Sequence, residues 1–256
     1  MDKAKFAPFN DNIEDNPDKN YIAGPYSTFD IELSKMARKK PKTIAEKKAL
    51  FERANRNISI SKLCKFNTYV GDEYIALLSR KDMKERLLKF DSMSDLEILN
   101  FAQDVIHEMS KLFDKTARLI PRMPVIATDK ISKMAFVPET DKNIDDELWV
   151  NLNNPENRIV EDFFNGLLHE FIHMVDYYVP NLGPLGAQIS NALRGNTVQP
   201  DEDKDVYFIN PREINAYMNH KRIPDLIRAI ITGSADKEKQ TEVNPFVFFR
   251  NITVKE

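Results

Sequence analysis

Apolar residues recur at helical spacing over several stretches of the chain. The clearest stretch is residues 94–118, where Ser94 begins a capping box ahead of a long amphipathic helix. Residues 158–178 show the same period, and residues 72–90 show it less regularly. Residues 43–57 also fit a helix, with a basic surface. These patterns predict a mainly helical protein.

The chain after residue 178 is first irregular and then helical again. Residues 179–209 are rich in Pro and Gly, so we expect a long connection there, with a short helix at 185–193. Asn210 is a suitable N-cap, and the proline that follows it favours a helix reaching about residue 220. Pro224 should start a last helix, which Gly233 stops.

Three short runs between the helices are apolar or alternate between apolar and polar positions. They are residues 123–128, 133–138 and 147–153, separated by Asp, Asn and Pro clusters, which is typical of a small sheet. We expect the third run, ELWVNLN, to be the edge strand against which an extended substrate pairs. The predicted fold class is therefore α+β.

The length bounds the domain organisation. A chain of 256 residues and 29.7 kDa holds one generous domain, or one domain with an extension. We expect residues 1–93 to form a mainly helical N-terminal extension consisting of an arm, a basic segment and a helix. Residues 94–233 should form the α+β domain, and residues 234–256 a C-terminal tail.

Composition excludes several classes of protein. No apolar run approaches the ~20 residues of a membrane helix, and the N-terminus lacks the apolar stretch of a secretory signal. We therefore expect no integral membrane segment, and a protein that is cytoplasmic or exported without a cleavable signal peptide. The single cysteine, Cys64, excludes an internal disulfide and a cysteine-rich metal site.

Charge is unevenly distributed along the chain. The formal net charge is −3, yet residues 35–65 carry eleven basic and two acidic side chains, a net charge of +9. A solvated helix surface would explain this segment. Binding to nucleic acid, an acidic partner or an anionic membrane surface is the alternative.

The strongest chemical signal is the pentapeptide His169-Glu170-Phe171-Ile172-His173. Residues four apart lie on one face of a helix, so both imidazoles can reach one Zn²⁺ ion. Glu170 lies beside them, placed to act as a base on a zinc-bound water. The pentapeptide falls in the middle of a predicted helix. The sequence therefore predicts a zinc site with an adjacent general base.

The order of these elements resembles the zincin metallopeptidases. A long helix, a small sheet, an HExxH helix, a connection and a later glutamate helix follow one another over residues 94–232. The segment HEFIHMVDYY is similar to the active-site helices of the glutamate-liganded branch, the gluzincins. The resemblance implies a zincin-like fold and a zinc-dependent hydrolase that cleaves peptide bonds. It does not extend to residues 1–93.

Two histidines leave a catalytic zinc site one protein ligand short. The branch with the motif HExxHxxGxxH needs Gly and His where this chain has Asp176 and Val179, which excludes it. A SprT-like protease should offer another histidine soon after the helix, but none lies between His173 and His220, which weakens that interpretation.

Glu213 is our candidate for the third ligand. It lies 40 residues after His173, in the segment NPREINAYMNH. The segment resembles the gluzincin pattern of a ligand glutamate followed three residues later by a small residue, here Ala216. The alternative is that Glu213, as the third residue of its helix, only completes a capping box with Asn210.

Other polar residues can support the site. Asp176 shares a helix face with both histidines. There it can either accept a hydrogen bond from a ligand histidine, outside the metal's own ligands, or form a salt bridge. His220, or Tyr217 one turn earlier, can donate a hydrogen bond to the oxyanion, and the alternative is a partly exposed histidine near a helix end. His107 is interpreted as an ordinary residue of its helix.

These observations predict a zinc metallopeptidase that acts on a protein or peptide substrate. His169, His173 and Glu213 would hold Zn²⁺, while Glu170 and His220 would be the catalytic residues. One alternative is a SprT-like or other nucleic-acid-associated protease that uses residues 35–65 for localisation. The other is a non-catalytic phage or effector interaction protein that retains a zincin-like fold.

Overall fold

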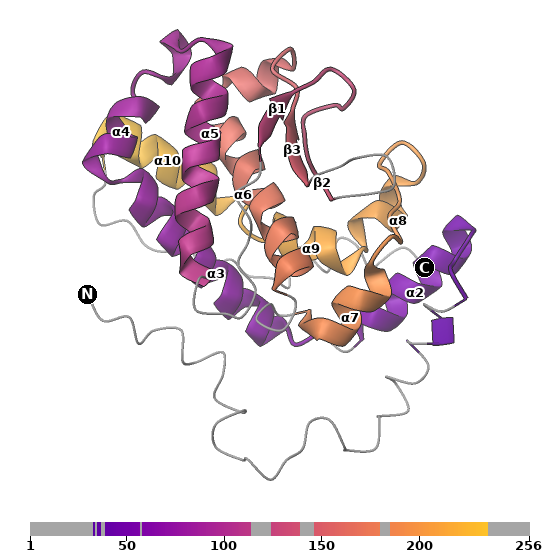
Figure 1. The fold of residues 1–256 in the computed structure, drawn as a ribbon. Coiled ribbons are helices and arrows are strands. Elements are labelled where there is room, and N and C mark those ends of the chain that lie inside the picture. Colours follow the sequence, from indigo (N-terminus) through magenta and orange to yellow (C-terminus); the bar gives the residue numbers. More distant parts are fainter. Residues whose placement is uncertain are drawn as a thin grey trace.

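The structure is a computed structural model, and it describes residues 33, 35–36, 39–56, 58–113, 124–138, 146–179 and 185–234. The helices are α2 (Ile44–Asn55), α3 (Ile60–Leu78), α4 (Lys81–Leu87), α5 (Asp95–Ser110), α6 (Val160–Tyr178), α7 (Gly186–Leu193), α8 (Lys204–Phe208), α9 (Pro211–Tyr217) and α10 (Arg222–Thr232). The strands are β1 (Val125–Ala127), β2 (Met134–Val137) and β3 (Glu147–Val150). The described chain thus combines many helices with one small sheet, compatible with the expected α+β class (Figure 1). The expected arm (residues 1–34) and C-terminal tail (residues 234–256) lie almost entirely outside the described residues.

The sheet has the strand order β1-β3-β2. β3 is parallel to β1 and antiparallel to β2, with Trp149 opposite Ile126 on one side and Ala135 on the other. The prediction that ELWVNLN is the edge strand is therefore wrong, because β3 lies in the centre. A linear sequence shows that a segment is a strand but not which neighbours it pairs with, and here β2 is the strand that packs on α6.

Helix α6 lies at the centre of the main core. It packs against β2, α5, α9 and α10, while α3 contacts α5 and α10 (Figure 1). Phe163 and Phe164 of α6 are fully buried, and Phe164 makes edge-on ring contacts with Phe90 and Phe101. The Tyr74 hydroxyl of α3 donates to the Phe164 carbonyl at 2.8 Å. The boundary expected between residues 93 and 94 thus falls inside one continuous core.

The N-terminal helices differ from the expected 72–90 helix. α3 begins at residue 60, where the Ser59 side chain accepts from the Lys62 amide, and it ends at Leu78. α4 then begins after Arg80. The apolar face of α3 continues back to Leu63, and the break after Leu78 divides an apolar pattern that we assigned to one helix.

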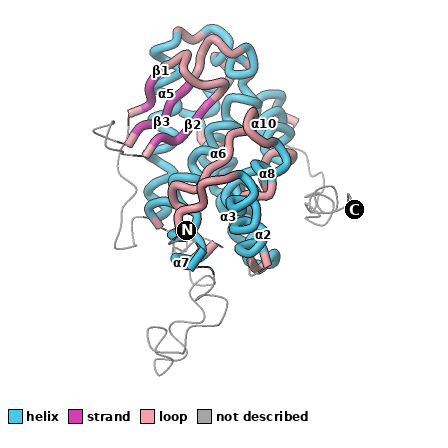
Figure 2. Tube along the Cα trace, turned by 90° about the vertical axis from the view of Figure 1, so that its right-hand side faces the viewer, coloured by secondary structure: helices cyan, strands magenta, loops and turns pink. Residues whose placement is uncertain are grey.

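A second apolar cluster lies at the end of the molecule opposite the sheet (Figures 1 and 2). There, Leu50 and Phe51 of α2 pack against Leu193 of α7 and Val206 of α8. The Asn55 side chain also donates to the Ile209 carbonyl at 2.7 Å. The basic helix α2 is therefore packed against the segment that leads into α9.

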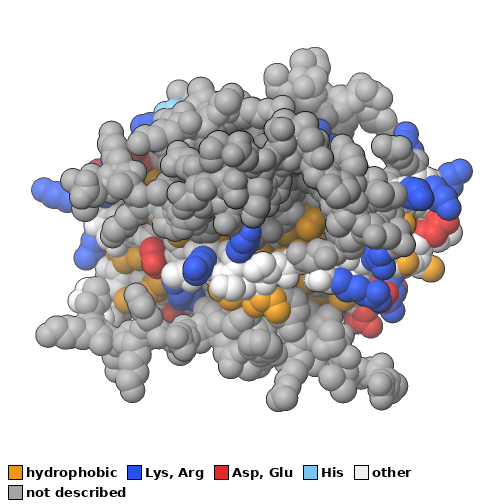
Figure 3. All heavy atoms as spheres, turned by 90° about the horizontal axis from the view of Figure 1, so that it is seen from below, with side chains coloured by type: hydrophobic (Ala, Val, Ile, Leu, Met, Phe, Trp, Pro, Cys, Tyr) orange, Lys and Arg blue, Asp and Glu red, His pale blue; other side chains and the backbone are white. Residues whose placement is uncertain are grey.

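Lys48 and Arg56 of this region are exposed, whereas Lys47 and Arg53 are only partly exposed. Lysine and arginine side chains, with some acidic ones, lie on the described surface of this end of the molecule (Figure 3). Lys48 pairs loosely with Glu52 at 4.0 Å, and the side chains of both are about half exposed.

No described helix combines the length and apolar character needed to cross a membrane.

Candidate metal centre

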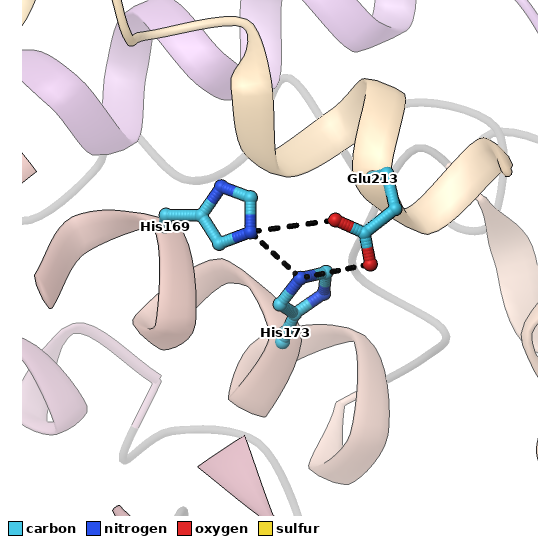
Figure 4. Close-up of side chains that lie close together, drawn as sticks. All are labelled: His169, His173 and Glu213. Atoms are coloured by element: carbon cyan, nitrogen blue, oxygen red, sulfur yellow. Dashed lines mark hydrogen bonds and ion pairs between the residues drawn. The ribbon is translucent and has the colours of Figure 1, made fainter. Parts of the chain in front are cut away.

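Two histidines of α6 point their ring nitrogens at each other. His169 and His173 are four residues apart on this helix, so they lie one turn apart on one face. Their Nε2 atoms are 3.0 Å apart and their rings are nearly perpendicular (Figure 4). Their side chains are largely buried, with exposed fractions of 8% and 16%. A helix of this period therefore brings together two of the predicted ligands.

Glu213 of α9 faces the same point from the opposite side (Figure 4). Its Oε2 lies 3.5 Å from His169 Nε2, and its Oε1 lies 3.5 Å from His173 Nε2. Asn210 does cap α9, but its side chain accepts from the Arg212 amide, while the Glu213 carboxylate is directed at the imidazoles. The structure thus places Glu213 among the predicted ligands rather than back at the cap.

The dimensions of this cluster fit a zinc ion. A tetrahedral zinc site with bonds of about 2.1 Å separates neighbouring ligand atoms by about 3.4 Å. Here the two Nε2 atoms are 3.0 Å apart and each lies 3.5 Å from a different oxygen of Glu213, while one ligand atom from each of the three residues lies within 4.8 Å of the others. Glu213 Oε2 is buried and has no hydrogen-bond partner among the described residues, which is costly for an anionic oxygen unless a cation lies nearby. Two imidazole nitrogens and one carboxylate form a donor set that suits zinc.

Electrostatic coupling within the cluster is strong. Burial is the largest single influence on the pKa of His173 and lowers it, but the charge and hydrogen bond of Glu213, together with the charges of Glu170 and Asp176, raise that pKa to about 9. Conversely, burial raises the pKa of Glu213, but the charges of His173 and His169 and their hydrogen bonds together outweigh burial and hold that pKa well below its ordinary value. In the metal-free cluster, protonated His173 and the Glu213 carboxylate therefore form an ion pair. A divalent cation can take the place of the proton on His173.

Glu170 is held beside the cluster without belonging to it. Its Oε2 accepts a hydrogen bond from the Phe136 amide of β2 at 2.8 Å, and its Oε1 lies 3.9 Å from His169 Nε2. The hydrogen bond from Phe136 uses Oε2, so Oε1 is the oxygen that faces the imidazoles. Sequence reasoning identified Glu170 but missed the Phe136 amide, because a backbone group leaves no signal in the sequence.

His220 lies behind His169. Its Nε2 is 3.1 Å from His169 Nδ1, the ring nitrogen that does not face Glu213. Burial, reinforced by the nearby charge of His169, lowers the pKa of His220 to about 3, so its ring is neutral and can accept from His169 Nδ1–H. The structure thus places the His220 ring against His169 Nδ1 rather than beside the nitrogen and oxygen atoms that converge in the cluster, where an oxyanion donor would be needed.

Two tyrosines lie beside the cluster. The Tyr217 ring packs edge-on against His169, with centroids 4.7 Å apart, and lies 4.3 Å from the His220 ring. Burial and then the charge of Glu213 raise the pKa of Tyr207, whose hydroxyl lies close to that carboxylate. Tyr207 was missed because its helix, α8, falls in a segment predicted to be irregular. The only local signal is Asp203, whose side chain accepts from the Val206 amide and caps α8.

Asp176 contacts neither histidine directly. Both of its carboxylate oxygens accept from the Asn215 amide group, at 3.2 and 3.0 Å. Burial raises the pKa of Asp176 to about 6, against the opposing positive charge of Arg212. Asp176 thus joins α6 to α9 through Asn215.

His107 lies on α5, outside the cluster, as expected for an ordinary residue of that helix.

Comparisons of the chain with family models, curated proteins and solved structures gave no match. The geometry of the cluster is therefore the basis for any assignment of function.

Proposed function

We propose that this protein is a zinc-dependent metallopeptidase in which His169, His173 and Glu213 hold the metal and Glu170 is the general base. The observation that carries the proposal is the convergence of three buried ligand atoms beside a separate carboxylate. An HExxH helix that only packed in a core would not need a glutamate from another helix directed at both imidazoles.

The chemistry divides between the metal and the chain. Zinc, when bound, polarises the scissile carbonyl and lowers the pKa of water. Glu170 Oε1 accepts the proton of the attacking water and passes it to the leaving amine, while the Phe136 amide holds Oε2 in place. The hydroxyls of Tyr207 and Tyr217 are the candidate donors to the oxyanion, since both lie near Glu213.

The substrate binds as an extended peptide along β2. Among the described residues this strand pairs only with β3, which makes it an edge strand of the described sheet, the position at which an extended peptide can add. The Phe136 amide is already bonded to Glu170, so a peptide there would pair through other backbone groups of the strand. A peptide paired with β2 would therefore bring its scissile bond close to both Glu170 and the metal.

Metal analysis and one substitution test this proposal. The full chain purified without added metal should contain about one zinc per molecule. Glu170→Gln should abolish peptide cleavage and leave the zinc content unchanged, because Glu170 is not a ligand. Glu161→Gln, on the same helix and outside the cluster, is the matched control and should cleave as the wild type does. A chain without zinc, or full activity in Glu170→Gln, would contradict the assignment.

A second proposal concerns residues 35–65. Lys39, Lys40 and Lys42 are exposed, as are Lys62 and Lys65 further on. This surface fits nucleic acid or an acidic protein as a partner that localises the peptidase. Binding of the full chain to double-stranded DNA should then weaken steeply as salt rises, and substituting these lysines by glutamine should remove it. DNA binding that is absent at low salt would contradict nucleic acid as the partner and leave an acidic protein.

A further inference from the structure

Four buried polar side chains form a continuous chain of hydrogen bonds next to the candidate metal centre. They are Asp176 of α6, Asn215 of α9, Asn67 of α3 and Asn219, which follows α9. Their exposed fractions are 1%, 0%, 3% and 3%. Interfaces between packed helices are ordinarily apolar, and polar groups are tolerated there when their hydrogen bonds are made.

The bonds of this network match donors to acceptors. The amide group of Asn215 donates to both oxygens of Asp176, and its Oδ1 accepts from Asn67 Nδ2 at 2.8 Å. Asn67 Nδ2 also donates to the Leu63 carbonyl at 3.0 Å. Asn219 donates to both the carbonyl and the Oδ1 of Asn67, at 3.1 and 3.3 Å. The network therefore specifies one arrangement of α3, α6 and α9.

The network joins the two helices that carry the ligands. Asp176 lies three residues after His173 on α6, and Asn215 lies two residues after Glu213 on α9. α9 has only seven residues, so it depends on its tertiary contacts for its position. The Asp176–Asn215 contact is the direct side-chain hydrogen bond between α6 and α9 closest in sequence to both ligands.

We propose that Asp176 and Asn215 are positioning residues that hold the Glu213 carboxylate opposite His169 and His173. The inference rests on the proposed function for its zinc chemistry. Neither residue touches the metal, yet zinc affinity depends on the pair because it sets the distance across the cluster. Outer partners of this kind change metal affinity without supplying a ligand.

Exchange of the two side chains tests this role. Asn215→Asp places a second carboxylate against the carboxylate of Asp176. Adding Asp176→Asn restores the hydrogen bond in the opposite direction, because the amide at position 176 then donates to the carboxylate at position 215. One oxygen of the new carboxylate still accepts from Asn67. We expect Asn215→Asp to weaken zinc binding by about 10- to 100-fold, and the double variant to recover most of that loss.

The measurement is the zinc dissociation constant of each full chain, by competition with a chromophoric chelator, alongside its Tm without metal. Asn157→Asp is the matched control, because Asn157 is also a buried asparagine but donates to the carbonyls of Lys133 and Asn151 near the sheet. This control should lower Tm and keep the wild-type zinc affinity. If Asn215→Asp fails to fold, Asn215→Ala is measured in its place.

Wild-type zinc affinity in the folded Asn215 variant, or no recovery in the double variant, would overturn the inference. A wild-type chain that takes up no zinc would instead refute the proposed function. Crystal structures of the metal-free chains then decide the inference. The distance from His173 Nε2 to Glu213 Oε1 is 3.5 Å here. It should be longer in Asn215→Asp and return to this value in the double variant. An unchanged distance would overturn it.

Discussion

Replacing Glu213 by glutamine should change the protonation of His173 in the metal-free protein. Burial alone lowers the pKa of His173, and the Glu213 carboxylate is the largest contribution that raises it to about 9. Glutamine has nearly the same size and no charge. The pKa of His173 should therefore fall by more than one unit in Glu213→Gln, although Glu170 still opposes the effect of burial.

The magnitude follows from the shift in the pKa. Moving from 6.5 to about 9 corresponds to about 3 kcal/mol at most, since one pKa unit is about 1.4 kcal/mol. Because the pKa of His173 is raised on folding, this stabilisation is fully present below pH 6.5 and is lost as the pH rises through about 9. The difference in unfolding free energy between the wild type and Glu213→Gln should shrink across that range.

Two measurements on the metal-free proteins check this prediction. NMR of histidine-labelled protein gives the pKa of His173, and urea unfolding at pH 6.5 and 9.5 gives the free energies. Glu161→Gln again serves as the control and should leave the titration of His173 unchanged, because Glu161 lies outside the cluster. A pKa of His173 at or below 6.5 in the wild type, or one unaffected by Glu213→Gln, would refute the reasoning.

Three further predictions concern zinc binding and the packing of α2. Zinc binding at pH 7.5 should release about one proton, because His173 is protonated beforehand and must become neutral; calorimetry in two buffers of different ionisation enthalpy would detect it, and an enthalpy independent of buffer would contradict it. His220→Ala should weaken zinc binding by about 10- to 100-fold, because it removes the hydrogen-bond partner of His169 Nδ1. His220→Gln should retain much of the affinity. Equal zinc dissociation constants for the two variants would count against His220 as the partner that orients His169. Phe51→Ala should lower the unfolding free energy by about 3–5 kcal/mol, measured in urea, because Phe51 is fully buried, while Lys48→Ala on the exposed face of α2 should change it little; similar losses in both would contradict the packing.

Local patterns account for much of the fold. The capping box at Ser94, the helical period of residues 158–178 and the Asn210–Pro211 start all correspond to observed helices. The three short runs are the three strands. These features depend on contacts between residues near in sequence, so their signals are present in the chain itself.

The candidate site divides along the same line. The spacing of His169 and His173 determines that both imidazoles share one face of a helix, and the sequence alone therefore identified these two residues and Glu170. Only the tertiary structure decided that Glu213 faces both rings, that His220 lies behind His169, and that Tyr207 lies near the carboxylate.

The central position of β3 and the inclusion of α3 in the main core were likewise decided by packing. So was the hydrogen bond from the Phe136 amide to Glu170, which joins a strand to a helix 34 residues later. Each depends on groups distant in the chain that meet because apolar faces are buried together. The sequence by itself determined the elements and the two-histidine motif, whereas the pairing of distant faces determined which further groups surround it.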